Sequence, residues 1–295
     1  MPGAVVDASL LNVGQREFEL FRDLIHKHTG IWLREGKEVM LASRLSRRLR
    51  RHGFSSFADY YDYLESCNDG GAELRELINC VTTNKTSFFR ERHHFDFLAE
   101  KVVPERLAMP LPVAARHEIA VWSAACSTGE EPYSVAITLL EARTRWRSLS
   151  SGWRIRIAAS DIDTAVLAKA TRAVYTGQDL ESIDPDLWKK YLLRGTGPAD
   201  GQIKVKKEVR SLVEFHRINL MDSLWPLREP FDAIFFRNAL IYFRQETQDS
   251  FLRRMARLLK PGGYLFLGHS EHIPWLNDVF QPLQKTVYRL RSAKA

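Results

Sequence analysis

Strand and helix patterns alternate along the chain after residue 119, and this alternation restricts the fold more than any other feature. Compact apolar runs typical of buried strands lie at 119–122, 153–159, 212–215, 231–236, 263–268 and 287–290. Apolar side chains at helical spacing predict helices over 132–143, 164–173 and 245–259. Strands and helices that alternate in this way build an α/β fold with a doubly wound, mostly parallel sheet.

The first hundred residues show helical spacing without a convincing strand. Phe18, Phe21, Leu24 and Ile25 illustrate the pattern, and glycines such as Gly30 punctuate it. We therefore expect a helical N-terminal domain and linker over residues 1–100, followed by the sheet domain over 101–295. Within the latter, glycine-rich turns around an alternating stretch predict a small antiparallel β-hairpin, inserted at about 190–212. A solvated loop is the alternative.

Composition narrows the environment and the partners. No apolar run of the 295-residue chain approaches the roughly 18 residues that span a bilayer, and the N-terminus lacks the pattern of a secretion signal. The three cysteines have no metal-ligand spacing, which suits reduced thiols in the cytoplasm. A net charge of +7 favours an acidic partner, which leaves nucleic acid, a membrane surface and an acidic protein open.

Small residues fill the turn between the first predicted strand and the helix after it. The run from Ser123 to Gly129 would let a ligand approach the backbone at the carboxyl end of the strand, where parallel sheets bind ligands. A single glycine does not make a pyrophosphate loop, and Glu130 and Glu131 would repel a diphosphate. These carboxylates suit a ligand that carries an ammonium group.

Polar residues also follow the later strands. Asp161 ends the second strand, where an acid can accept hydrogen bonds from ribose hydroxyls. A helix N-cap is the alternative for Asp161, although Asp163 is the better candidate for that role. Asn219 suits a heterocycle edge, and Arg237 and Asn238 follow a buried strand and need a partner there.

Taken together, the chain resembles the chemotaxis receptor glutamate methyltransferase (CheR) family of class I S-adenosylmethionine (SAM) dependent methyltransferases. The motifs that carry the resemblance are TTNKTSFFRERHHF (82–95), WSAACSTGEEPYS (122–134), ASDID (159–163), RGTGP (194–198), FDAIFFRNALIYF (231–243) and LLKPGGYLFLGHSE (258–271). The resemblance implies a Rossmann-like SAM domain with a helical N-terminal domain and a β-subdomain. It also implies methyl transfer from SAM to glutamates on receptor cytoplasmic helices, which yields glutamate γ-methyl esters and S-adenosylhomocysteine (SAH).

The resemblance also implies roles for particular positions. The cofactor-binding set is Asn84, Thr86, Arg90, Glu130, Glu131, Asp161, Asn219, Leu220, Arg237 and Asn238. Within it, Glu130 or Glu131 would hold the methionine ammonium, Asp161 the ribose, Asn219 and Leu220 the adenine, and Arg237 and Asn238 the methionine end. Arg90 and Tyr242 match the positions nearest the transferred methyl. The general methyltransferase pattern has an acid at the end of the first strand, whereas Ser123 stands here, so a carboxylate after Gly129 would replace it.

The implied nucleophile is a carboxylate that is already ionised at neutral pH, so no general base is required. Arg90 is expected to orient the substrate glutamate through charge-assisted hydrogen bonds, and Tyr242 to donate to it or to pack beside the methyl. A surface ion pair is the alternative for Arg90, and a core position the alternative for Tyr242.

A basic stretch at 37–51 predicts the surface for the acidic substrate. Arg44, Arg47, Arg48 and Arg51 fall on one face of a helix, which we expect to dock on the chemoreceptor's cytoplasmic helical domain. A merely solvated face is the alternative. In some members of the family the β-subdomain binds a receptor C-terminal pentapeptide, and the RGTGP turn permits it here.

Two other functions fit the sequence less well. A nucleic-acid methyltransferase is disfavoured because the sequence after the fourth strand lacks the Pro-Pro-Tyr or Pro-Pro-Phe signature of amino-directed base methylases. A non-catalytic SAM-binding adaptor is disfavoured by the presence of Arg90 and Tyr242. We expect no membrane insertion, because no apolar run is long enough. We also expect no metal, since the histidines at 93–94, 269 and 272 have no clear cluster of further ligands around them.

Overall fold

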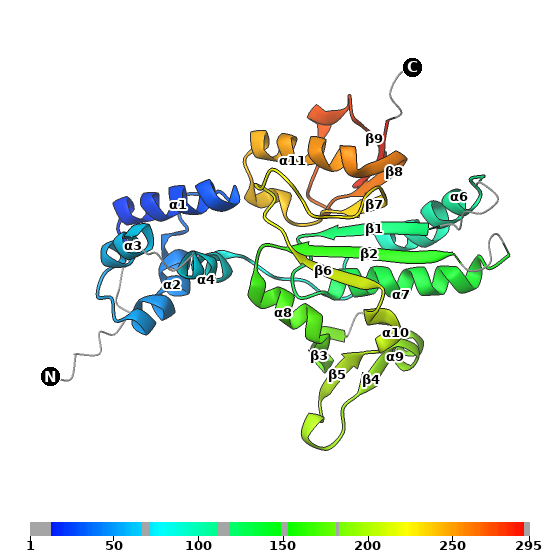
Figure 1. The fold of residues 1–295 in the computed structure, drawn as a ribbon, viewed down its shortest axis with the longest axis horizontal. Coiled ribbons are helices and arrows are strands. Elements are labelled where there is room, and N and C mark those ends of the chain that lie inside the picture. Colours follow the sequence, from blue (N-terminus) through cyan, green and yellow to red (C-terminus); the bar gives the residue numbers. More distant parts are fainter. Residues whose placement is uncertain (1–12, 67–70, 111–117, 149–152, 181–182, 292–295) are drawn as a thin grey trace.

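The computed structural model describes residues 13–66, 71–110, 118–148, 153–180 and 183–291. A small helical domain and a larger sheet domain lie side by side, joined by an extended linker that begins at Thr82 (Figure 1). Within the described residues, no helix is both long enough and apolar enough to cross a membrane.

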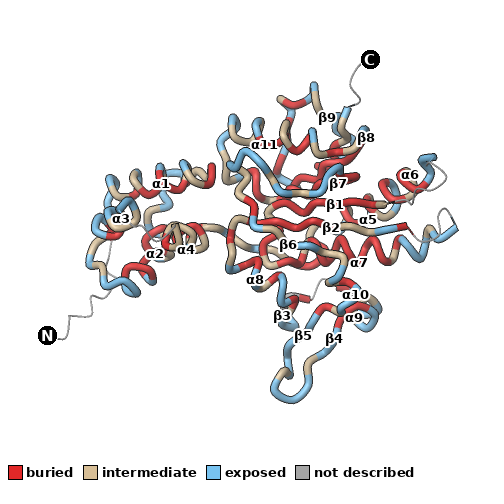
Figure 2. Tube along the Cα trace, viewed as in Figure 1, coloured by how far each residue is buried: buried red, intermediate tan, exposed pale blue. Residues whose placement is uncertain are grey.

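The N-terminal domain is helical, as the spacing predicts. Its helices are α1 (Gln15–Thr29), α2 (Glu38–His52), α3 (Phe57–Ser66) and α4 (Ala72–Val81). Apolar side chains from all four, among them Phe18, Phe21, Leu45 and Leu77, share one core, and buried residues are red in Figure 2. Burying these side chains stabilises the small domain as a unit of its own.

The sheet domain has seven strands in the order β6-β2-β1-β7-β8-β10-β9. Their bounds are β1 (Glu118–Ala124), β2 (Arg154–Asp161), β6 (Val213–Arg217), β7 (Phe231–Phe235), β8 (Leu259–Phe266), β9 (Phe280–Gln284) and β10 (Val287–Leu290). The first five strands in that order pair in parallel, and β10 runs antiparallel to both of its neighbours. The expected α/β fold with a mostly parallel sheet is confirmed.

Helices cover both faces of the sheet (Figure 1). Alternate residues of β1 face opposite ways, so that Ile119 and Val121 join one core and Ala120 and Trp122 the other. The helical elements of this domain are α5 (His93–Phe97), η2 (Leu98–Val102), α6 (Val103–Leu107), α7 (Glu130–Arg145), α8 (Thr164–Arg172) and α11 (Gln245–Leu258). Because the parallel strands are buried on both faces, a ligand is expected to reach the sheet at the carboxyl ends of these strands.

The inserted β-subdomain is larger than the expected hairpin. The hairpin is present as β4 (Leu192–Arg194) and β5 (Gln202–Val205), but a third strand, β3 (Val174–Thr176), pairs with the other edge of β5. The insertion therefore begins well before residue 190 and also includes α9 (Pro185–Tyr191). The three residues of β3 are too few to show an alternating pattern, and only their pairing with β5 makes them a strand.

Arg48 of α2 is an internal residue of the N-terminal domain. Its Nε donates to Glu73 Oε1 at 2.9 Å, and the Tyr60 hydroxyl donates to the same oxygen at 2.6 Å. Burial pushes the pKa of Glu73 upward, but the hydrogen bonds from Arg48 and Tyr60 outweigh it and leave the pKa below its ordinary value. Glu73 is therefore ionised, and Arg48 joins α2 to α4 through a buried ion pair.

Removing Glu73 leaves the Arg48 charge buried without its main counterion. We expect Glu73→Ala to lower the free energy of unfolding by about 3–5 kcal/mol, measured by urea denaturation. Glu76 is the matched control, because it lies three residues further along α4, its side chain is 48% exposed and it contacts Arg48 at 3.4 Å. Glu76→Ala should cost less than about 1 kcal/mol. Equal losses in the two variants would contradict a structural role for the buried pair.

Candidate active site

A cavity of about 640 Å³ lies between the two domains at the carboxyl ends of the sheet strands. The sheet domain contributes the residues that follow β1, β2, β6 and β7, and the linker crosses the cavity from Thr82 to Arg90. The N-terminal domain contributes Thr29 and the segment 31–34, together with Lys37, Met40 and Arg44. The cavity is therefore a shared space, and neither domain encloses it alone.

The structure brings most of the expected site residues to this cavity. Those that line it are Asn84, Thr86, Arg90, Glu131, Asp161, Asn219, Leu220, Arg237, Asn238 and Tyr242. Glu130 is the exception, since it is 2% exposed and accepts a hydrogen bond from the Thr128 hydroxyl at 2.6 Å. Of the two acids that the sequence left open for the ammonium group, Glu131 is the one that faces the cavity.

Arg237 lies buried at the end of β7 between two carboxylates. Its guanidinium nitrogens lie 2.9 Å from Glu131 Oε2 and 3.3 Å from Glu91 Oε2, and it also donates to the carbonyl of Arg90. Burial raises the pKa of Glu91, but the charge of Arg237 together with hydrogen bonds from the His269 backbone and Asn238 outweighs that effect and lowers the pKa to about 2. Two carboxylates around one guanidinium give the group a surplus negative charge when both are ionised, which fits the ammonium group of a methionine moiety.

The turn before α7 explains why its residues are small. Ala125 and Ser127 have φ values of 57° and 51°, and Gly129, with φ of 95°, precedes the first residue of α7. A Cβ at position 129 would lie 2.8 Å from the Cβ of Ala170 and 3.0 Å from the Tyr175 hydroxyl. Glycine is therefore required at this position for both its conformation and its lack of a side chain.

Asp161 ends β2 with both carboxylate oxygens fixed by backbone groups. Oδ2 accepts from the Ser127 N–H at 2.8 Å and Oδ1 from the Asp163 N–H at 3.0 Å. Burial raises the pKa of Asp161 to about 6. The cap of α8 is Asp163, which accepts from the N–H groups of Ala165 and Val166. The N-cap alternative for Asp161 is thus excluded, and Asp161 lines the cavity.

The linker places Arg90 at the cavity without an ion pair among the residues that the structure describes. Arg90 is half-buried and donates from Nη1 to the carbonyl of Lys85 at 2.9 Å. The surface ion pair that was its alternative is not what the structure shows. Tyr242 is likewise half-buried in η5 (Leu240–Tyr242) and lines the cavity, so it is not a core tyrosine.

Both ends of the Asn219 side-chain amide already have hydrogen-bond partners within the protein. Its Nδ2 donates to the carbonyl of His28 at 2.6 Å, and its Oδ1 accepts from the Met221 N–H at 3.0 Å. The side chain joins the N-terminal domain to the sheet domain beside the cavity. Contact with adenine stays a prediction, and it would use the amide's remaining N–H and lone pair.

Trp32 is a cavity residue that the sequence did not indicate. Its backbone N–H donates to the carbonyl of Tyr242 at 2.8 Å, and the guanidinium of Arg244 lies 3.4 Å from the centre of its ring. The Arg22 guanidinium lies over the same ring at 4.6 Å. The contact between Trp32 and Tyr242 forms only when the two domains meet, so no local sequence pattern predicts it.

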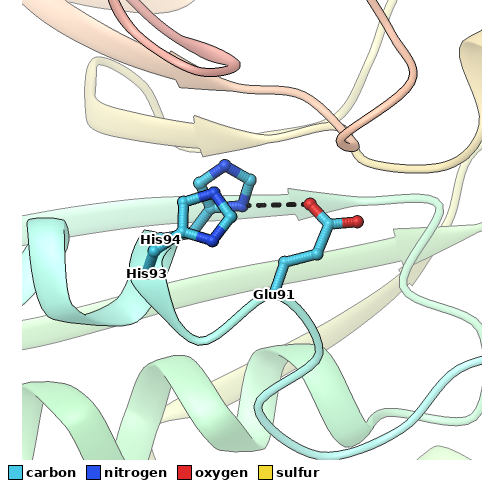
Figure 3. Close-up of side chains that lie close together, drawn as sticks. All are labelled: Glu91, His93 and His94. Atoms are coloured by element: carbon cyan, nitrogen blue, oxygen red, sulfur yellow. Dashed lines mark ion pairs between the residues drawn. The ribbon is translucent and has the colours of Figure 1, made fainter.

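The histidine pair has a carboxylate beside it, contrary to our expectation. Candidate ligand atoms of Glu91, His93 and His94 all lie within 4.8 Å of one another (Figure 3). However, Arg237 contacts Glu91 Oε2, and burial followed by Arg237 lowers the pKa of His94 to about 3. A metal cation would meet the same repulsion, and His94 Nε2 is within 3.1 Å of the Thr286 hydroxyl. We therefore assign no metal to this cluster.

Of the cysteines, Cys80 and Cys126 are free thiols, and Cys67 lies outside the described residues.

The expected docking face of four arginines is wrong in part. Arg48 is buried against Glu73, and Arg44 turns its guanidinium to the end of α4, where it donates to the carbonyl of Thr82 at 3.0 Å. Arg47 and Arg51 are exposed. The helical repeat puts all four on adjoining positions, but two of them serve acceptors within the domain, which the repeat does not reveal.

A mostly parallel sheet in this strand order, with a cavity at the carboxyl ends of its strands, is the architecture of SAM-dependent methyltransferases. The chain belongs to the CheR methyltransferase family. The family's all-alpha domain matches residues 16–82, and its SAM-binding domain matches residues 84–289.

Curated relatives agree over nearly the whole chain. The chain is 43% identical over 286 residues to a protein from Salmonella typhimurium named chemotaxis protein methyltransferase, which covers 97% of this chain and 93% of that protein. It is 42% identical over 287 residues to chemotaxis protein methyltransferase 2 of Pseudomonas aeruginosa, with 97% of each chain covered. The expected family, enzyme class and SAM cofactor are confirmed.

The raised pKa of Asp161 predicts a pH dependence of cofactor binding. A carboxylate accepts hydrogen bonds from ribose hydroxyls, and protonation below about pH 6 replaces an acceptor by a donor. We expect the Kd for SAH, measured by calorimetry, to rise as the pH falls from 7 to 5. Asp161→Asn should bind more weakly at every pH and lose most of this dependence. An unchanged pH profile in that variant would assign the titration to another group.

Proposed function

We propose that the protein transfers the methyl group of SAM to glutamate side chains on the cytoplasmic helices of chemoreceptors and forms γ-methyl esters. It would act in the cytoplasm during chemotactic adaptation. The names of the relatives support the pathway. The observation that carries the proposal is the shared cavity, in which Lys37, Arg44 and Arg90 bring positive charge to the edge of the cofactor site. A substrate that presents a carboxylate fits these charges.

The residues present fit SAM. The Arg237 group with its two carboxylates would hold the methionine end through Glu131, and Asp161 would accept from the ribose hydroxyls. SAM, when bound, supplies an electrophilic methyl on a sulfonium. The ionised glutamate forms the new C–O bond as the C–S bond breaks, and the pair of electrons stays on sulfur in SAH. Because the attacking carboxylate is already ionised, no proton has to move.

The protein's own contribution is alignment and exclusion of water. Arg90 would orient the substrate carboxylate through its guanidinium, whose position is set by the bond to Lys85. Tyr242 would donate to that carboxylate from its hydroxyl, and the backbone N–H of Trp32 holds the Tyr242 carbonyl. Binding the substrate carboxylate too tightly would stabilise the ground state and slow the reaction. Arg90 and Tyr242 would share the hydrogen bonds to that carboxylate between two separate donors.

For the docking surface we now propose the exposed members of the basic helix, Arg47 and Arg51, in place of the full set of four. The helical repeat puts both on the α2 surface, and Arg44 links that surface to the cavity wall. Acidic receptor helices would be attracted there, and such long-range attraction weakens in salt. Nucleic acid remains the less favoured partner, because the cavity chemistry is arranged around a carboxylate.

We also propose that the β-subdomain holds a receptor C-terminal pentapeptide by strand addition. In the three-stranded sheet, β5 is central, so β3 and β4 are the edges. Leu193 and Arg194 of β4 are exposed, which offers an apolar and a cationic contact beside the edge backbone. Receptor domains with and without the last five residues separate this contact from docking on α2.

Transfer of labelled methyl from SAM to purified receptor cytoplasmic domains tests the function. We expect label on the receptor that mild alkali releases as methanol, since an ester hydrolyses and an N-methyl group does not. Incorporation should fall as the salt concentration rises. Alkali-resistant label would mean a different acceptor atom, and label on nucleic acid in place of receptor would overturn the substrate assignment.

Arg90 can be tested separately from cofactor binding. We expect Arg90→Ala to reduce turnover at least about a hundredfold, because a charge-assisted contact to the nucleophile is lost. Arg92 is the matched control, since it lies two residues along with its side chain 57% exposed and an ion pair to Asp96 only at 3.9 Å. Arg92→Ala should retain turnover. Normal turnover in Arg90→Ala, with an unchanged melting temperature, would remove Arg90 from the mechanism.

A further inference from the structure

Four residues from three separate segments close a ring of hydrogen bonds beside the cofactor cavity. The Ser127 hydroxyl donates to the Asn84 carbonyl at 3.0 Å, and the Ser127 N–H donates to Asp161 Oδ2 at 2.8 Å. The Asp163 N–H donates to Asp161 Oδ1 at 3.0 Å, and Asn84 Nδ2 donates to Asp163 Oδ2 at 2.8 Å. The ring joins the linker, the turn after β1 and the end of β2.

Asp163 is the one member of the ring that does not line the cavity. It is 1% exposed, and its two oxygens serve different groups. Oδ1 caps α8 by accepting from the N–H groups of Ala165 and Val166, whereas Oδ2 accepts from the side chains of Thr82 and Asn84 on the linker. Capping needs only the first oxygen, so the second has a separate purpose.

We propose that Asp163 is a positioning residue for the cofactor. It holds the linker residue Asn84 at a set place relative to the Asp161 carboxylate, so that both meet SAM in one arrangement. The buried carboxylate can do this because charge-assisted hydrogen bonds are shorter and more directional than neutral ones. The proposal rests on the cofactor contacts proposed for Asn84 and Asp161, and it does not depend on the identity of the methyl acceptor.

A second contact nearby allows the ring to be separated from the attachment of the two domains. The side chain of Asn79 on α4 donates to the Thr164 hydroxyl at 2.9 Å and accepts from the Thr164 N–H at 3.1 Å. Asn79 joins the N-terminal domain to α8 without entering the ring or the cavity. If attachment alone mattered, losing Asn79 would disturb cofactor binding as much as losing Asp163.

Asp163→Ser is the decisive variant. Serine is a good N-cap, so α8 keeps its cap, but one short hydroxyl cannot also serve Thr82 and Asn84. We expect the Kd for SAH, measured by calorimetry on the full chain, to rise at least tenfold. Two controls should stay within about twofold of the wild type. They are Asn79→Ala, which removes the domain contact, and Asp184→Ser, which changes the exposed N-cap of α9 that accepts from the Asp186 N–H.

Ser127→Ala approaches the ring from the other side and keeps the test valid if Asp163→Ser does not fold. It removes the hydroxyl bond to Asn84 while the backbone bond to Asp161 remains. We expect a several-fold rise in the Kd for SAH. If Asp163→Ser folds, the fold-loss of SAH affinity in the double variant Asp163→Ser/Ser127→Ala should be smaller than the product of the two single fold-losses.

Two results would overturn the proposal. One is a wild-type Kd for SAH in Asp163→Ser or, if that variant does not fold, in Ser127→Ala, even with a lowered melting temperature, since the ring would then serve stability alone. The other is an equal loss of affinity in Asn79→Ala and Asp163→Ser. Because SAH binding is read without a methyl acceptor, failure of the receptor assay would leave this result intact.

Discussion

The buried guanidinium of Arg237 is the interaction on which the site depends. It lies at the end of β7 and holds Glu131 of α7, Glu91 of the linker and the backbone carbonyl of Arg90 at once. A buried arginine charge is very costly without such partners, so the linker can only take the path that supplies them. The stability of the sheet is thereby coupled to the position of the residues that would meet the transferred methyl.

The same coupling accounts for the conformation of the linker. Phe89 and Glu91 both have positive φ, of 49° and 59°, which is unfavourable for residues with side chains. Phe89 buries its ring against Phe95, and Glu91 reaches Arg237. The backbone on either side of Arg90 is therefore held in a tight path by side chains that face inward, which leaves the Arg90 side chain to face the cavity.

Local chemistry was enough to predict the sheet and most of its cavity edge. Apolar runs in β1, β2 and β7 and polar residues directly after them, such as Asp161 and Arg237, depend on neighbours in sequence. The residues that sequence analysis misjudged depend on distant ones. Arg48 falls on the same helical repeat as Arg47, and only the approach of Glu73 from α4 makes it internal. Strand β3 is short and β9 is partly polar, and each is recognised as a strand only by its pairing, β3 with β5 and β9 with β10. Nothing near Trp32 in the sequence indicates that Tyr242 lies against it.

The meeting of Trp32 with Tyr242 has a consequence for how proteins of this kind can change. The domain expected to select the receptor also supplies one wall of the chamber where the methyl is expected to move, since the Trp32 N–H holds the Tyr242 carbonyl and Arg244 covers the indole. Recognition and chemistry are therefore not independent modules. A foreign N-terminal domain grafted onto this sheet domain would have to bring a segment that matches the Tyr242 backbone. Lineages that acquire new receptors would accordingly alter the exposed face of α2 and keep the inner loop at residues 31–32 unchanged.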